Sequence, residues 1–194
     1  MPLFKNRYQT ESNRLENWDY SSEAIYFLTL VAQNRECIFG AIDDDKMLLN
    51  DNGKIIETEL LKSITIRERW FFHNWIIMPN HIHLLVEIKN DNSISSVETH
   101  CSASLPCTSL QLESELKLSK LSRKPNSISS FVAAFKSVTT KQINVLMNHD
   151  VNTIWQSNYH DHIVRNYNSF DTIYQYIKNN PKNWNTDSIK SSLE

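Results

Sequence analysis

Three long apolar runs along the chain have the character of buried β-strands. Residues 24–31 form a continuous run rich in β-branched and aromatic side chains, which predicts a central strand. Residues 70–78 and 81–88 are two more such runs, separated by Pro79 and Asn80. Because proline has no N–H to donate to a ladder, we expect the chain to turn there between two paired strands.

Two further stretches carry apolar residues at helical spacing. The first covers residues 128–147, where Ser127 or Ser129 could be the N-cap. The second covers residues 168–180 and ends at Pro181, because the residue before a proline is disfavoured in α geometry. A short β-like stretch at 163–164 lies between these two predicted helices.

The region between the first two strands is less regular. Residues 43–45 are three aspartates, which predict a polar turn. Asn52-Gly53 favours either a small hairpin, with residues 54–56 as its second arm, or a turn that leads into a helix. A third helix is predicted over residues 58–69.

Strands interleaved with helices indicate an α+β fold, one antiparallel sheet with helices packed on one side of it. A chain of 194 residues is most simply one domain, residues 1–194. Residues 89–127 are rich in Ser, Asn and Thr and have poor periodicity, so we interpret them as a largely mobile insertion within that domain.

Charge is distributed unevenly along the chain. The net charge of −2 by itself argues against a general nucleic-acid binder. However, residues 120–182 hold eight Lys and Arg against three Asp, whereas residues 1–119 are acidic. A basic half is compatible with a phosphate backbone, and Lys136, Lys141 and Arg165 are our candidate DNA contacts. Ordinary surface charge explains each of the three equally well.

Three features of the sequence bear on compartment and membrane association. No apolar run reaches the roughly 20 residues that a membrane span needs, and residues 1–17 lack an apolar signal region. The three cysteines are an odd set without C-x-x-C spacing, which suits a reducing compartment. We therefore expect a cytoplasmic protein with no membrane partner.

His81 and His83 are the most informative pair in the sequence. In a strand, alternate side chains point to the same face, so both imidazoles share one face while Ile82 points into a core. Two such imidazoles can ligate one divalent metal if further ligands come from elsewhere. Taken alone, the pair fits two histidines on a solvated strand face better than a metal site.

A second pair lies near the end of the last predicted helix. Tyr176 and Asn180 are four residues apart and so share one helix face, whereas Ile173 and Ile177 face the core. Beside a metal, a tyrosine hydroxyl can attack phosphorus and form a phosphotyrosine bond. An amide oxygen from Asn180 suits a hard cation such as Mg²⁺ or Mn²⁺. When this helix is considered alone, Tyr176 is more commonly explained as an amphipathic residue at the border of the apolar face, with no catalytic role.

Several blocks of residues together resemble a known family. Residues 75–85, with Met-Pro-Asn-His-Ile-His, resemble the HUH motif of single-tyrosine transposases. Two more groups resemble the branch called REP-associated tyrosine transposases: 26–27, 33–37 and 39–40 near the N-terminus, and later Ile154-Trp155-Gln156, Tyr159, Asp161-His162, Arg165-Asn166, Tyr176-Ile177 and Asn180-Pro181. These blocks occur in the same order as in that family and cover most of the chain outside residues 89–127.

The resemblance implies a ferredoxin- or RRM-like fold and a metal-dependent enzyme. It implies that His81, His83 and Asn180 hold the divalent metal and that Tyr176 is the nucleophile. The implied reaction cleaves single-stranded DNA, leaving a 5′-phosphotyrosine and a free 3′-hydroxyl, with a DNA hairpin as the recognised partner.

Three alternatives remain open at the level of sequence. The chain could be a catalytically silent DNA-binding module of the same fold, acting as a regulator or a domesticated factor. It could instead hydrolyse small phosphoesters without a phosphotyrosine intermediate. The sequence also fits both a monomer and a homodimer that exchanges tyrosine helices.

Overall fold

The three apolar runs pair with one another in a single antiparallel sheet. The computed structural model describes residues 3–4, 7–8, 18–89, 123–148 and 152–190. Within them, strands β3 (Ala24–Val31), β6 (Trp70–Ile77), β7 (His81–Ile88) and β8 (His160–Val164) form a sheet in the order β6-β7-β3-β8. All three neighbouring pairs are antiparallel, so the sheet predicted from the sequence is confirmed.

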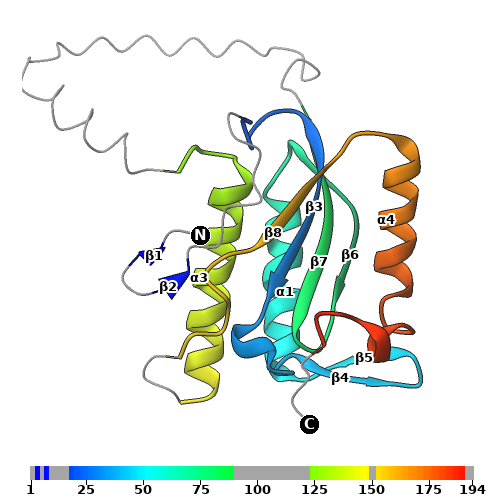
Figure 1. Ribbon diagram of the computed structural model, residues 1–194. Helices are drawn as coiled ribbons and strands as arrows, with labels where there is room; N and C mark the ends of the chain where they lie inside the picture. The colour runs from blue at the N-terminus through cyan, green and yellow to red at the C-terminus, as the bar shows by residue number, and fades with distance from the viewer. Residues whose placement is uncertain (1–2, 5–6, 9–17, 90–122, 149–151, 191–194) are drawn as a thin grey trace, which may run out of the picture.

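Two layers of helices cover this sheet, one on each face (Figure 1). Helices α1 (Asp51–Thr65) and α3 (Ile128–Leu146) pack on one face and contact each other. Helix α4 (Tyr167–Asn179) lies on the opposite face, over β6 and β7. The expectation of helices on only one side was wrong, because the apolar side of α4 has its own partners on the second face. These partners and the α4 residues that meet them are Leu85, Val164, Ile25, Phe27, Ile76, Phe170, Ile173, Tyr174 and Ile177.

The strand period of two assigns residues to these two faces. Leu28 of β3 and the neighbouring Leu84 of β7 are fully buried in the main core under α1 and α3. Thr29 lies directly opposite His83, and both therefore point to the α4 face. Ile82 belongs to the main core, as the alternation in the sequence predicts.

The element order β3-α1-β6-β7-α3-β8 is the βαββαβ arrangement of a ferredoxin-like fold, which confirms the predicted fold class. Helix α3 begins after Ser127, whose hydroxyl accepts a hydrogen bond from the Ser130 amide, so the cap predicted at Ser127 is present. The order and the two-layer cover place α4 and its tyrosine over the strand that carries the two histidines.

The region between β3 and α1 differs from the prediction in detail. A small hairpin forms from β4 (Gly40–Asp43) and β5 (Lys46–Leu49), and its turn residues Asp44 and Asp45 both have positive φ. Helix α1 then begins directly, because the Asn50 side chain accepts from the Gly53 amide and caps it. Residues 54–56 are therefore helical rather than a second hairpin arm.

The chain after α4 returns to the sheet through short turns. The 3₁₀ segment η3 (Trp184–Thr186) follows the end of α4, and η1 (Gln33–Arg35) follows β3.

Near the N-terminus, β1 (Leu3–Phe4) and β2 (Arg7–Tyr8) pair with each other. Of the predicted insertion at 89–127, residues 90–122 lie outside the described residues. Among the described helices, none is long and apolar enough to cross a membrane.

Candidate active site

His81 and His83 lie side by side on β7, beneath α4. Both side chains are buried, with 0% and 1% of their surfaces exposed, and their ring centroids are 4.5 Å apart. The interpretation of a solvated strand face is therefore wrong for this pair, because the α4 layer covers it. Burial of two polar rings requires that their nitrogen atoms find partners within the protein or in a bound ion.

Each ring is held at Nδ1 by a neutral side-chain oxygen. Asn80 Oδ1 lies 2.8 Å from His81 Nδ1, and Thr29 Oγ1 lies 2.9 Å from His83 Nδ1. Thr29 reaches His83 because the two residues are directly opposite in the β3–β7 register. With Nδ1 engaged in both rings, the two Nε2 atoms are the ones that face the remaining groups of the site.

Burial keeps both imidazoles neutral near pH 7. Desolvation lowers the pKa of His81 to about 4, against a smaller raising effect of Asp187 and Asn180. Desolvation, with a further contribution from His81, lowers the pKa of His83 well below its ordinary value. Neutral imidazoles have a free lone pair, so both side chains are in the state that binds metal.

Tyr176 points from α4 toward the histidine pair. Its hydroxyl lies 3.3 Å from His83 Nε2, and its ring packs edge-on against Phe27 of β3. The residue is 39% exposed, so part of the side chain is open to solvent while the ring is held against Phe27. Partial burial, followed by the nearby Asp187 carboxylate, raises the pKa of Tyr176, so the bare site holds a protonated phenol.

Asn180 and Asp187 complete the cluster from the chain after α4. Asn180 is the C-cap of α4 and is buried, and its amide donates to Asp187 Oδ2 at 3.2 Å. Asp187 Oδ2 is in turn 3.9 Å from His81 Nε2. One ligand atom each of His81, His83 and Asp187 lie within 4.8 Å of one another. Asn180, which the sequence analysis predicted for the site, lies in this cluster, whereas Asp187 was not predicted.

The donor atoms of this cluster fit a divalent cation. Among the described residues, His81 Nε2 and Asn180 Oδ1 are buried side-chain atoms without a hydrogen-bond partner. Ligands bonded to one Mg²⁺ at roughly 2.1 Å are at most about 4.2 Å apart, so the cluster needs only a small closure to reach coordination distance. A cation would satisfy both orphaned atoms and neutralise the buried Asp187 carboxylate.

Asp187 had only a weak signal in the sequence. It is the only Asp or Glu between Thr172 and Lys190, in a segment that follows the stop at Pro181. No helical or strand spacing relates it to Tyr176, because it reaches the site through the turns after α4 rather than along the helix.

Comparison with known proteins places the chain in a family. No protein-family model matches it. An uncharacterized protein of Haemophilus influenzae is 33% identical over 180 residues, which cover 92% of this chain and 91% of that protein. The chain belongs to the same family as this Haemophilus influenzae protein. Similarity over nearly the whole of both chains indicates that the family shares the α+β domain described above.

A solved structure extends the comparison to the fold. The structure of a REP-associated tyrosine transposase bound to a REP hairpin matches with a TM-score of 0.56 and 16% identity, over 91% of this chain and 74% of that one. This chain therefore has a transposase-like fold, and the resemblance seen in the sequence is confirmed at that level.

The three predicted DNA contacts are not brought together with the histidine and tyrosine cluster. Lys136 is on α3, behind the sheet, and its ammonium donates to the Gln156 and Asn158 carbonyls at 2.7 and 2.8 Å. Burial lowers the pKa of Lys136 to about 8. Lys141 is exposed on the same helix. The two hydrogen bonds to the Gln156 and Asn158 carbonyls give Lys136 a structural role, because they hold the segment before β8 against α3.

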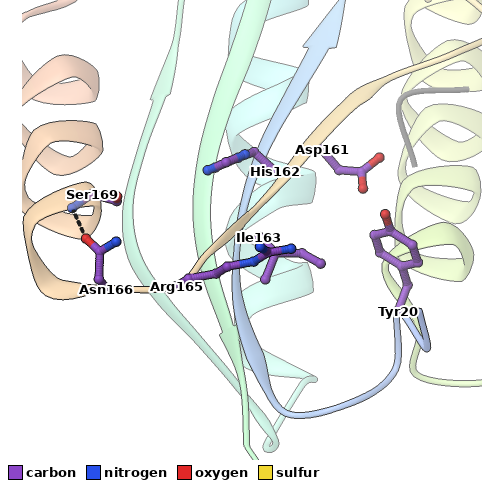
Figure 2. A pocket seen from close by; sticks show the side chains of 7 residues that line it. All are labelled: Tyr20, Asp161, His162, Ile163, Arg165, Asn166 and Ser169. Atoms are coloured by element: carbon purple, nitrogen blue, oxygen red, sulfur yellow. Dashed lines mark hydrogen bonds between the residues drawn. The ribbon is translucent and has the colours of Figure 1, made fainter. Parts of the chain in front are cut away.

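Arg165 lies between β8 and α4, on the edge of the sheet. It is exposed and lines a pocket of about 390 Å³ together with His162 of the edge strand and Ser169 of α4 (Figure 2). Tyr176 is eleven residues further along the chain, and the helical part of that separation, from Tyr167 to Tyr176, spans about 14 Å along the axis of α4. Among the three predicted contacts, Arg165 is the nearest to α4 along the chain, and its side chain extends from the edge of the sheet toward Ile163 and Tyr20 (Figure 2).

Proposed function

We propose that this protein is a metal-dependent transesterase that cleaves and rejoins single-stranded DNA through a tyrosine nucleophile and recognises a DNA hairpin. The observation that carries the proposal is the position of the Tyr176 hydroxyl, 3.3 Å from one of two adjacent buried histidines. A nucleophile, two neutral imidazoles and a buried carboxylate converge on one point, which supports a metal-assisted attack of tyrosine on phosphorus.

The protein's own residues have distinct parts in this reaction. His81, His83, Asn180 and Asp187 would hold a divalent metal such as Mg²⁺ or Mn²⁺. The metal would polarise the scissile phosphate and stabilise the charge that develops on it. Phe27 packs against the ring of Tyr176 and fixes its direction.

The bond changes balance without any nucleotide cofactor. The oxygen of Tyr176 attacks phosphorus and forms a phosphotyrosine bond as the bond to the 3′ oxygen of the DNA breaks. The phenolic proton is lost and the leaving 3′ oxygen gains one. The bare site raises the pKa of Tyr176 by burial and through Asp187. A cation bound beside the Tyr176 hydroxyl would lower this pKa again, because it favours the negatively charged phenolate. This is a physical reason for the reaction to depend on a metal.

Arg165 is our proposed phosphate contact on the substrate strand. Its guanidinium suits bidentate contacts to phosphate, and the pocket beside it opens on the edge of β8, next to the start of α4. A strand running from Arg165 to Tyr176 would span several nucleotides. Lys141 and Lys136 stay predictions as DNA contacts, the latter in addition to its contacts with two carbonyls.

The test is an incubation of the purified protein with end-labelled hairpin DNA that carries single-stranded flanks. Mg²⁺ or EDTA is added, and the products are separated on a denaturing gel. We expect a metal-dependent, protein-linked band that is absent in Tyr176→Phe and present in Tyr167→Phe, a matched change at an exposed tyrosine of the same helix. A retarded complex on a native gel without any linked band would instead favour a catalytically silent DNA-binding module.

A further inference from the structure

Asn80 sits at the junction of three segments of the site. It is the residue before β7 and is fully buried. Its side-chain nitrogen donates to the carbonyls of Arg35 and Ile189, at 2.9 and 3.0 Å, while its oxygen lies 2.8 Å from His81 Nδ1. One amide group therefore contacts the segment after β3, the C-terminal segment and a candidate metal ligand at once.

The two carbonyl contacts fix which way the amide points. A carbonyl oxygen only accepts hydrogen bonds, so the Asn80 atom between Arg35 and Ile189 must be the nitrogen. The atom that faces His81 is then the oxygen, which also only accepts. His81 must therefore carry its proton on Nδ1, and Nε2 is left with the lone pair that a metal needs.

The same amide holds the turn that presents Asp187. The Ile189 carbonyl accepts from Asn80, and the Ile189 amide donates to Asp187 Oδ1 at 2.8 Å. Arg35 adds a second tie to this turn, since its guanidinium donates to the Ser188 carbonyl at 3.1 Å. The direction of the Asp187 carboxylate thus depends on the docking of residues 187–189 against Asn80.

We propose that Asn80 is a positioning residue that assembles the metal site, by setting the tautomer of His81 and by docking the turn that carries Asp187. The proposal rests on the proposed function only for the metal itself. Asparagine suits the position because one group must offer an acceptor on one side and two donors on the other. Aspartate keeps the acceptor and loses both donors, so Asn80→Asp separates the two roles.

The experiment compares Asn80→Asp and Asn80→Ala with Asn148→Asp, the same charge change at an exposed residue beyond α3. Three quantities are measured on the full chain. They are the ¹⁵N chemical shifts of the His81 ring, the hydrogen exchange of the Ile189 amide, and the affinity for Mn²⁺ by calorimetry.

In Asn80→Asp we expect His81 to keep its proton on Nδ1. The Ile189 amide should exchange faster by on the order of tenfold, because the new carboxylate repels the Arg35 and Ile189 carbonyls. Mn²⁺ affinity should fall by roughly 10–100-fold. In Asn80→Ala we expect the same losses together with a mixture of His81 tautomers. Asn148→Asp should match the wild type in all three measurements.

Unchanged Ile189 exchange and unchanged Mn²⁺ affinity in both Asn80 variants would overturn the proposal. If the variants do not fold, the ¹⁵N chemical shifts of the wild-type His81 ring test the proposal. A ring protonated on Nδ1 supports it, and a ring protonated on Nε2 contradicts it. Failure of the proposed function is recognised separately. A wild type that forms no DNA adduct or binds no Mn²⁺ leaves the tautomer and exchange results to decide the role of Asn80.

Discussion

The hydroxyl of Tyr176 and Nε2 of His83 lie 3.3 Å apart, so the candidate nucleophile contacts the ring nitrogen of a candidate metal ligand. When His83 carries its proton on Nδ1 and donates to Thr29 Oγ1, its Nε2 is an acceptor to which Tyr176 donates. A metal bound to His83 would take the Nε2 lone pair and release the hydroxyl. Nucleophile and ligand are thus coupled through one nitrogen atom.

This coupling predicts that Tyr176→Phe does not weaken metal binding. The change removes a hydrogen bond that competes for His83 Nε2, and such a bond is worth about 1 kcal/mol. We expect Mn²⁺ affinity to stay the same or to rise by up to about fivefold in calorimetric titrations. His83→Gln is the comparison that should lower the affinity. A tenfold loss in Tyr176→Phe would mean that the phenol is itself a ligand.

The carboxylate of Asp187 is expected to contribute to metal binding. Asp187→Asn keeps an oxygen that can accept from the Ile189 amide but removes the negative charge near His81 Nε2. We expect Mn²⁺ affinity to fall by roughly 10-fold or more, since hard cations prefer anionic oxygen ligands. Asp171→Asn, on the exposed side of α4, serves as the matched control. Equal affinities in the two variants would leave Asp187 outside the metal site.

Stability without metal should fall on acidification below pH 6.5. The pKa of His81 is about 4 in the folded chain, against an ordinary value of 6.5. Between these values the unfolded chain binds the proton and the folded chain does not, so the free energy of unfolding decreases as pH falls. His81 contributes a loss of at most about 3 kcal/mol, complete below pH 4, and His83 acts in the same direction.

The measurement is urea unfolding in EDTA at several pH values between 7 and 4.5. His81→Gln removes one of the two buried titrating groups and should flatten the pH dependence. His162→Gln, on the exposed edge strand, should leave the curve as in the wild type. A wild type whose stability increases toward pH 5 would contradict the burial argument.

Gly40 is expected to be intolerant of any side chain. Its φ is +147°, and a Cβ there would lie 2.1 Å from the Leu48 carbonyl oxygen of the paired strand. Gly40→Ala should destabilise the protein by roughly 2–4 kcal/mol in chemical unfolding, because strain and a backbone clash add. Ala41→Gly, one residue on, should cost about 1 kcal/mol or less. Similar losses in both variants would refute the strain argument.

Local patterns in the sequence determined much of the fold and named every residue of the candidate site except Asp187. The strand periods of residues 24–31 and 81–88 placed both elements and assigned His81 and His83 to one face. Helical spacing placed Tyr176 and Asn180 together, and the structure brings that helix over the histidines. These inferences succeeded because they depend on the geometry of a single strand or helix.

Tertiary structure alone decided the rest, because the remaining contacts join residues far apart in the chain. Thr29 meets His83 only through strand register, and Asp187 reaches His81 only through the turns that follow α4. The burial that makes both imidazoles neutral depends on α4 covering the second face of the sheet, which the chain's periodicity did not reveal. The sequence by itself named His81, His83, Tyr176 and Asn180, and the packing of the sheet between two helical layers set the charge states of the imidazoles and added Asp187 beside them.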